Sequence, residues 1–260
     1  MKRDGEFQAL AQVMDRLREK DGCPWDKKQT HETLKTFLIE EVYEVLEAID
    51  KGLPEGLKEE LGDLLMHIFF LAQISRERGE FDIYDVGGSA VTKMINRHPH
   101  VFGGTEASTP EEVELNWSEL KRREKGKSGA ASVLHDIPLH LPALLKAYRL
   151  TQKASSIGFD WKHVGDLFEK IQEELKELGE AIRDGDQKNI EAEFGDLLFT
   201  LVNVARFIHV NPEEALRKSI SKFVTRFKYV EKVFSKRKKG LKGASLEEMD
   251  RIWEEAKGLE

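Results

Sequence analysis

The residues of this 260-residue chain that could carry chemistry are two clusters of carboxylates with the same internal spacing. The first cluster combines an E-E-x-x-E motif, which begins at Glu40, with an E-x-G-D motif, which begins at Glu60. The second cluster repeats both motifs from Glu173 and Glu193, at one offset of 133 residues (from 40 to 173 and from 60 to 193). Because every acidic position recurs at this offset, we interpret the pattern as two copies of one site.

Helical spacing predicts that the carboxylates of each motif share a helix face and bind a divalent metal. Residues three or four positions apart lie on the same side of an α-helix. If the two helices of a copy run antiparallel, four carboxylates converge. Oxygen ligands alone select hard cations, so we expect Mg²⁺, which Mn²⁺ can replace, rather than zinc. The candidate metal ligands are Glu41, Glu44, Glu60 and Asp63 in the first copy and Glu174, Glu177, Glu193 and Asp196 in the second.

The alternative to a metal site is an ordinary solvated acidic helix surface, which is usual for one isolated E-x-x-E pair. Repetition of both motifs at one spacing argues against it. Gly62 and Gly195 interrupt the predicted helices at a cost of about 1 kcal/mol against Ala, which predicts close approach of a helix or a ligand. His67 has Thr200 as its counterpart, so we interpret it as a packing or supporting residue.

The repetition extends beyond the carboxylates and predicts a tandem duplication of a whole domain. For example, Lys93 and Arg97 return as Lys222 and Arg226, and Trp117 corresponds to Trp253. Changes in the offset fall between predicted helices, where insertions are tolerated. A small and polar stretch from Gly126 to Ser132 is typical of a flexible linker. We therefore predict an N-terminal domain at residues 1–126, a linker at 127–137 and a C-terminal domain at 138–260.

Apolar residues recur at helical spacing around both acidic clusters, so the predicted fold is all-α. Breaks at 51–54 and 184–186 separate the helices of each copy, and Pro138 and Pro142 are expected to start the first helix of the second domain. No convincing strand pattern occurs. Isolated helical hairpins bury too little surface to be stable alone. Each domain is therefore expected to be a helical bundle, whose apolar faces the other domain or a second chain completes.

Composition limits the compartment and the partners. The formal net charge of −7 argues against nonspecific nucleic-acid binding. A basic stretch at 232–239 leaves contact with RNA open as an alternative to a solvated helix end. The single cysteine, Cys23, excludes a disulfide framework. Neither an N-terminal signal core nor a run of about 18 apolar residues occurs, so we expect a soluble, cytoplasmic protein without a membrane partner.

The chain resembles, over essentially its full length, the MazG family of nucleoside triphosphate pyrophosphohydrolases, which belongs to the all-α NTP-pyrophosphatase superfamily. The resemblance rests on both acidic sets and on the segments Gly22–Asp26, Gln29–His31, Arg97–Gly103, Gly158–Trp161, Lys222–Phe227 and Ser245–Met249. It implies Mg²⁺-dependent hydrolysis of an NTP to NMP and pyrophosphate, and a homodimer. It also implies a role in removing noncanonical nucleotides or adjusting nucleotide pools, and it leaves room for a pyrophosphatase side activity.

Several residues outside the acidic motifs are candidates for substrate contacts. Arginine and lysine suit phosphate oxygens, and the resemblance gives this role to the basic pairs. Asn203 has Phe70 as its counterpart, which mildly favours the second copy as the NTP site. Aromatic residues, Phe159 among them, could stack on a base, although buried aromatics more often belong to the core. The candidate substrate contacts are Lys93, Arg97, Lys121, Asn203, Lys222, Arg226, Trp25 and Trp161.

The predicted reaction is attack of water on the NTP with help from the bound metal. The catalytic candidates are Glu40, Glu41, Glu173 and Glu174, with Glu40 and Glu173 to accept the proton of water or orient a ligand. One repeat could instead only dimerise, bind nucleotide or regulate, since both acidic sets are intact. A carboxylate-bridged di-iron bundle would use Glu-x-x-His pairs, which do not accompany these motifs. The sequence also has no G-x-x-x-x-G-K-[ST] loop of a P-loop NTPase.

Overall fold

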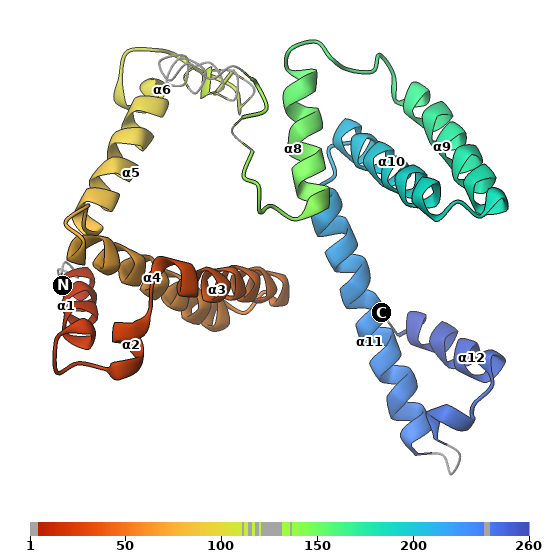
Figure 1. The fold of residues 1–260 in the computed structure, drawn as a ribbon, viewed down its shortest axis with the longest axis horizontal. Helices are drawn as coiled ribbons and strands as arrows, with labels where there is room; N and C mark the ends of the chain where they lie inside the picture. Colours follow the sequence, from red (N-terminus) through yellow and green to blue (C-terminus); the bar gives the residue numbers. More distant parts are fainter. Residues whose placement is uncertain are drawn as a thin grey trace. The chain divides into compact units, whose positions relative to one another are not determined.

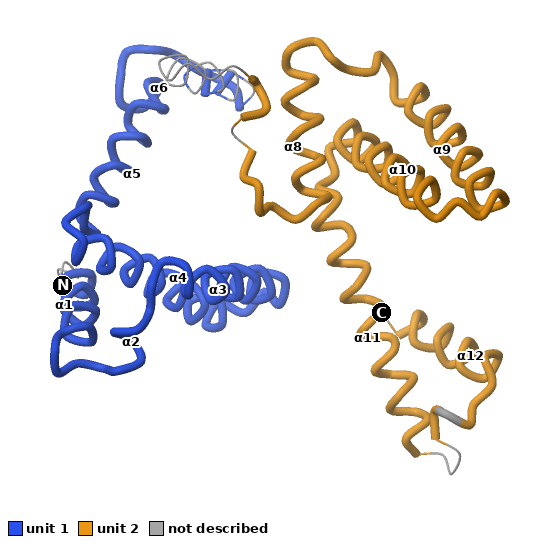
Figure 2. Tube along the Cα trace, viewed as in Figure 1, with its two compact units in different colours: residues 1–127 blue, residues 128–260 orange. Residues whose placement is uncertain are grey.

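The computed structural model describes residues 5–110, 112–113, 116–117, 120, 132–135, 137–236 and 240–259 (Figure 1). The elements in this part of the chain are helices, and it contains no strand, which confirms the all-α prediction. The chain divides into two compact units, Met1–Lys127 and Ser128–Glu260 (Figure 2). The linker expected at 127–137 stays a prediction, because residues 127–131 and 136 lie outside the described residues.

The helices of the two units repeat in the register of the acidic motifs. The helix α9 begins 133 residues after α3 (from 31 to 164), and α10 begins 133 residues after α4 (from 54 to 187). The helices of unit 1 whose bounds lie within the described residues are α1 (Glu6–Arg18), α2 (Pro24–Lys28), α3 (His31–Lys51), α4 (Pro54–Glu77), α5 (Ile83–Arg97) and α6 (Pro99–Phe102). Those of unit 2 are α8 (Ala143–Ser155), α9 (Val164–Asp184), α10 (Gln187–Phe207), α11 (Pro212–Ser235), the 3₁₀ turn η1 (Leu241–Gly243) and α12 (Leu246–Lys257).

Short turns join the two acidic helices of each unit into an antiparallel hairpin (Figure 1). The helix α3 ends at Gly52, which has a left-handed φ of 65°, and α4 starts with Pro54 at its first turn. In unit 2, Gly185 has a φ of 70°, and the Asp186 side chain accepts hydrogen bonds from the first backbone N–H groups of α10. Glycine adopts positive φ without the steric cost of a Cβ, which explains both turns. Both predicted helix breaks are confirmed.

Apolar packing anchors one end of the α3–α4 hairpin. Met14 of α1 packs there with Leu34 of α3 and with Phe69, Phe70 and Ile74 from the C-terminal half of α4. Glu60 lies in the N-terminal half of α4, between this core and the turn. In unit 2 the corresponding hairpin buries Leu167 and Val202, and a second cluster joins α11 to α12 through Val230, Phe234 and Ile252.

Two local expectations are changed by the structure. Pro142 immediately precedes α8 rather than lying inside it, and Pro138 lies upstream of the helix. A Cβ built on Gly62 or Gly195 meets no heavy atom within 4 Å. Close approach of another described helix of the same unit therefore does not explain these glycines, and that part of the prediction is wrong. Approach of a ligand stays a prediction.

No helix in the described part of the chain is both long enough and apolar enough to cross a membrane. Several apolar side chains on the α3–α4 hairpin remain exposed on the single chain. They are Ile39, Val42, Tyr43, Ile49, Leu61, Met66 and Ile68. The expectation that another surface completes the apolar faces is consistent with this exposure.

The change Gly62→Ala is expected to raise the midpoint temperature of thermal unfolding, followed by circular dichroism in the presence of a chelator. Alanine is favoured over glycine inside a helix by about 0.5–1 kcal/mol, and the added methyl group has open space. The matched control is Gly52→Ala, which should lower the midpoint because φ is positive there. A lower midpoint for Gly62→Ala would contradict the open space around this position.

Candidate functional site

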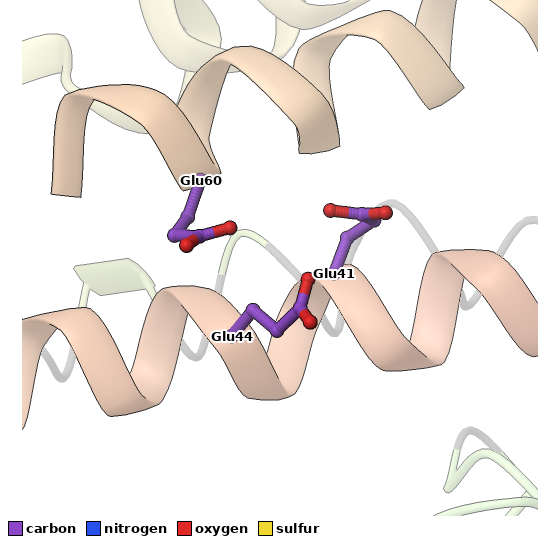
Figure 3. A group of neighbouring side chains, drawn as sticks. All are labelled: Glu41, Glu44 and Glu60. Carbon is purple, nitrogen blue, oxygen red and sulfur yellow. The ribbon is translucent and has the colours of Figure 1, made fainter. Parts of the chain in front are cut away.

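Three carboxylates meet between α3 and α4 of unit 1 (Figure 3). Glu41 and Glu44 project from α3 and Glu60 projects from α4, and one oxygen of each lies within 4.8 Å of the others. The α3 pair is one helical turn apart, and the Gly52 turn brings α4 back alongside it. Ligand oxygens about 2.1 Å from an octahedral Mg²⁺ lie about 3–4 Å apart, so small rotamer changes would close this group on one ion. We call it the unit 1 triad.

The unit 1 triad is electrostatically unbalanced. The Oε2 atom of Glu41 is buried and has no hydrogen-bond partner among the described residues. The Nδ1 atom of His67 lies 3.8 Å from Glu41 Oε1. Burial raises the pKa of the Glu41 carboxyl. The charge of His67 opposes this rise, and the neighbouring carboxylates add to it, namely Glu44, Asp63 and Glu60. Burial also raises the pKa of Glu60, with help from nearby carboxylates. These shifts are typical of carboxylates whose burial and mutual repulsion outweigh the positive charge nearby.

His67 supports the unit 1 triad as expected. Its side chain is buried, and its ring stacks on Phe37 at a centroid distance of 6.3 Å. Its Nδ1 atom also lies 3.1 Å from the backbone oxygen of Asp63. The contacts with Phe37 and Asp63 hold the imidazole against Glu41 without making it a member of the triad.

Unit 2 holds an equivalent group, which we call the unit 2 triad. Glu174 and Glu177 of α9 and Glu193 of α10 each place a carboxylate oxygen within 4.8 Å of the other two. Glu174 is only 4% exposed. Its Oε1 atom forms an ion pair with Lys170 Nζ at 2.9 Å. The same ammonium lies 2.9 Å from Glu173 Oε1. Unlike the unit 1 triad, the unit 2 triad has a lysine in direct contact.

The charges around the unit 2 triad also shift pKa values. Burial raises the pKa of Glu193, and Glu177, Glu174 and Asp196 add to the rise. The two carboxylate contacts raise the pKa of the Lys170 ammonium well above its usual range, so this side chain stays charged at neutral pH. The triad therefore combines crowded negative charge with one fixed positive charge.

The structure brings together three of the four predicted ligands in each unit. Asp63 and Asp196 do not belong to the groups within 4.8 Å, although their charges raise the pKa values of Glu60 and Glu193. The proton-acceptor candidates also lie outside the triads. Glu40 is exposed on α3, and Glu173 is exposed on α9 and contacts Lys170.

The basic pairs lie on helices that lead away from the acidic hairpins of their own units (Figure 1). Arg97 ends α5, and its guanidinium lies 5.5 Å from the ring centroid of Trp117. Arg226 on α11 makes the same contact with Trp253, at 5.7 Å. Lys93 and Lys222 are exposed one turn before these arginines. Each unit thus has an arginine–tryptophan cation–π pair. The helix that carries the arginine leads away from the triad of the same unit.

The remaining substrate candidates are placed as follows. Trp25 and Trp161 are exposed, as is Phe159, so the core role weighed for these aromatics is wrong. Asn203 Oδ1 accepts a hydrogen bond from Arg206 Nε at 3.1 Å, and Arg206 in turn pairs with Asp160. Asn203 therefore helps to hold an arginine of its own unit. The candidate Lys121 lies outside the described residues.

Sequence reasoning missed Lys170 and the two tryptophans. Lys170 precedes Glu173 by three residues and Glu174 by four, which is the spacing of helical ion pairs. Its counterpart in the first copy is Phe37, so comparison of the copies could have identified it. Trp117 and Trp253 are counterparts in the sequence, as are Arg97 and Arg226, and the recurrence of both residue types in the two copies was the available signal.

The described residues contain two groups of at least three histidine, cysteine or acidic side chains in range of one ion, and these are the two triads. No histidine belongs to either group. The donor set is therefore carboxylate oxygen, which suits magnesium and manganese.

Comparison with known proteins places both triads in one kind of domain. The chain matches the MazG nucleotide pyrophosphohydrolase domain twice, at residues 29–102 and 164–231. It is 48% identical over 252 residues to the nucleoside triphosphate pyrophosphohydrolase/pyrophosphatase MazG of Thermotoga maritima, which covers 97% of this chain and 96% of that protein. It is 39% identical over 258 residues to the nucleoside triphosphate pyrophosphohydrolase of Escherichia coli K12, with 98% of each covered. A crystal structure of a mazG-related protein from Thermotoga maritima matches 44% of this chain and 98% of its own, at 33% identity and a TM-score of 0.38.

The raised carboxyl pKa values predict how the stability of the metal-free protein depends on pH. Between the ordinary value of 4.5 and the raised values, the folded chain holds protons that the unfolded chain has released. The free energy of unfolding contributed by Glu41 and Glu60 should therefore fall as pH rises through this window. Chemical denaturation in a chelator, repeated from acid to neutral pH, measures this fall.

The double variant Glu41→Gln/Glu60→Gln should lose this contribution, whereas Glu32→Gln, an exposed change on α3, should keep it. Saturating Mg²⁺ should also reduce the fall in wild type, because the ion balances the charge. An unchanged pH dependence in the double variant would show that the triad is not its source.

Proposed function

This chain belongs to the MazG nucleotide pyrophosphohydrolase family, and we propose that it hydrolyses nucleoside triphosphates to the monophosphate and pyrophosphate with Mg²⁺ held at its triads. Family membership makes it a hydrolase that acts on acid anhydrides, a nucleoside triphosphate pyrophosphohydrolase. The observation that supports the finer proposal is the convergence of three carboxylate oxygens within 4.8 Å in each MazG domain.

Two properties of the triads favour a hard divalent cation. The donors are all carboxylate oxygens, which Mg²⁺ prefers and Mn²⁺ accepts. The buried Oε2 of Glu41 has no hydrogen-bond partner among the described residues, and such an atom is costly unless an ion or a water completes it. The residues present therefore fit the metal that the family implies.

In this proposal, some carboxylates bind the metal and others accept a proton. When bound, a divalent ion neutralises charge on phosphate oxygens and lowers the pKa of water. The triad residues hold the ion, and Asp63 and Asp196 reach it by changing rotamer. Glu40 and Glu173, one turn before Glu44 and Glu177, accept the proton of the attacking water.

We also propose that the working form is a homodimer. Both hairpins expose large apolar side chains, such as Val42 and Ile68 on unit 1 and Phe194 on unit 2. A second copy that covers these side chains would remove them from water. It would also allow the basic residues of α5 and α11, helices that lead away from their own hairpins, to serve triads of the other chain. In this arrangement Lys93, Arg97, Lys222 and Arg226 contact phosphates.

The remaining proposed substrate contacts include two tryptophans. Trp25 and Trp161 are exposed, so a nucleobase could reach and stack on them. Asn203 and Lys121 complete the proposed set. We also propose a second activity on pyrophosphate itself, because the Thermotoga maritima relative is named a pyrophosphatase as well as a pyrophosphohydrolase. Removal of noncanonical nucleotides, or control of nucleotide pools, is the biological role that we propose.

The products distinguish this reaction from other triphosphatases. Incubation of the protein with a panel of NTPs and Mg²⁺ should give NMP and no NDP, with pyrophosphate equal to NMP at the earliest times, before pyrophosphate is itself hydrolysed. A chelator should abolish turnover. Chromatography of the nucleotides and a coupled pyrophosphate assay measure this. NDP and inorganic phosphate as products would contradict the proposal.

Substitution of one ligand in each triad tests which copies turn over. Glu44→Gln and Glu177→Gln remove one negative ligand each. If one repeat carries all turnover, its variant should lower the kcat/KM of the chain by about 100-fold or more, and if both repeats turn over equally, each variant should lower it by about half. Glu32→Gln, an exposed change on α3, is the control and should leave kcat/KM unchanged. If one of the two variants keeps full activity, its repeat has a structural or regulatory role.

The dimer is tested by its mass in solution. Wild type should sediment at twice the mass of one chain. The change Val42→Glu puts a charge on the exposed apolar face of α3 and should shift the protein toward monomer. Val13→Glu, on the exposed side of α1, should leave the mass unchanged. A wild-type monomer at assay concentration would contradict the proposed assembly.

A further inference from the structure

The two triads differ in one charged neighbour. In unit 2, Lys170 Nζ lies 2.9 Å from Glu174 Oε1 and 2.9 Å from Glu173 Oε1. In unit 1, the residue 133 positions earlier is Phe37, whose ring packs on His67 instead. Over the described residues, the basic side chain within ion-pair range of the unit 1 triad is His67, 3.8 Å from Glu41. Among the described residues, one copy thus has a permanent cation in ion-pair contact with its triad, and the other has none within that range.

The Lys170 contacts differ from an ordinary surface ion pair. The Glu174 side chain is only 5% exposed, and the Lys170 side chain is 30% exposed. Exposed pairs at this helical spacing are screened by water and contribute little. A buried carboxylate, by contrast, interacts strongly with the charge beside it. Lys170 is also held from two sides, because Glu173 accepts a second hydrogen bond from the same ammonium.

The same oxygen atoms are required by the lysine and by a divalent ion. Glu174 is a member of the unit 2 triad and its most buried one, so an ion bound there must share or displace the ammonium. In unit 1, the equivalent residue Glu41 has one buried oxygen without a partner among the described residues. An ion entering the unit 1 triad therefore meets carboxylates that no described ammonium contacts directly, although His67 and Lys51 lie near enough for their charges to act on Glu41 and Glu60. An ion entering unit 2 meets a carboxylate that is already paired.

We infer that Lys170 acts as an internal counter-ion that competes with the divalent metal for Glu174, so that the nucleotide-free protein binds metal more tightly in unit 1 than in unit 2. This inference rests on the proposed function, since it takes the triads as the metal sites. The duplicated carboxylates then give two sites of unequal affinity, and the inequality comes from one residue that the duplication did not preserve. Lys170 is in this sense a positioning residue for the metal.

The affinities can be measured without turnover. Mn²⁺ is titrated into the full-length, nucleotide-free protein, and free Mn²⁺ is followed by electron paramagnetic resonance. Wild type should show two classes of site. Glu60→Gln should remove the tighter class and Glu193→Gln the weaker class, which assigns each to its unit. If Glu193→Gln removes the tighter class instead, the inferred order is overturned.

Three substitutions at Lys170 then test its charge. Lys170→Met and Lys170→Gln should each tighten the weaker class by about tenfold, because a neighbouring positive charge is removed. Lys170→Arg keeps the charge and should leave the weaker class close to wild type. The matched control is Lys176→Met, since Lys176 is an exposed lysine on α9 whose ion-pair partner, Glu180, lies 3.9 Å away. Two neutral variants are used so that the test survives if one of them misfolds. Circular dichroism checks that both keep their helical content.

The outcomes separate the inference from the proposed function. If wild type binds no Mn²⁺, the metal part of the proposed function fails and the inference fails with it. If wild type binds Mn²⁺ in two classes but neither neutral variant tightens the weaker one, the inference alone is overturned. The same holds if Lys176→Met tightens it equally, because a general loss of positive charge would then explain the effect.

Discussion

The constraint on which the rest of the structure depends is the repulsion among carboxylates held between two packed helices. Each triad places three oxygens within 4.8 Å of one another, partly shielded from water. Like charges at this distance repel, and burial increases the cost. The raised pKa values of Glu41, Glu60 and Glu193 express that cost. Such a cluster persists where positive charge balances it, and this need connects the fold to metal binding.

The helical hairpin holds the carboxylates together because both of its ends are fixed away from the triad. Apolar packing fixes one end of the α3–α4 pair through α1, and the Gly52 turn fixes the other. The triad lies between these two anchors, so its carboxylates cannot separate by spreading the helices. The same construction recurs in unit 2 with Gly185 and with α8 beside α10. Stability supplied by the anchors thus offsets repulsion at the site.

The two copies solve the charge problem in different ways. Unit 2 supplies a cation of its own, Lys170, to its most buried carboxylate. Unit 1 has an aromatic residue at that place and sets His67 near Glu41. Duplication preserved the ligands while the residues around them diverged. Two sites of one ancestry can therefore take up different tasks without any change in the carboxylates.

The sequence by itself determined the helical class, the duplication, the helix breaks and the carboxylate motifs, because these depend on spacing along the chain. Residues three or four apart on a helix share a face whatever surrounds them, so Glu41 and Glu44 were paired correctly. Only the tertiary structure decided how deeply Glu174 is buried, that Asp63 stands outside the triad, that Gly62 faces open space and that Trp25 is exposed. These properties depend on how one helix is rotated and packed against another, and a one-dimensional pattern does not contain that rotation.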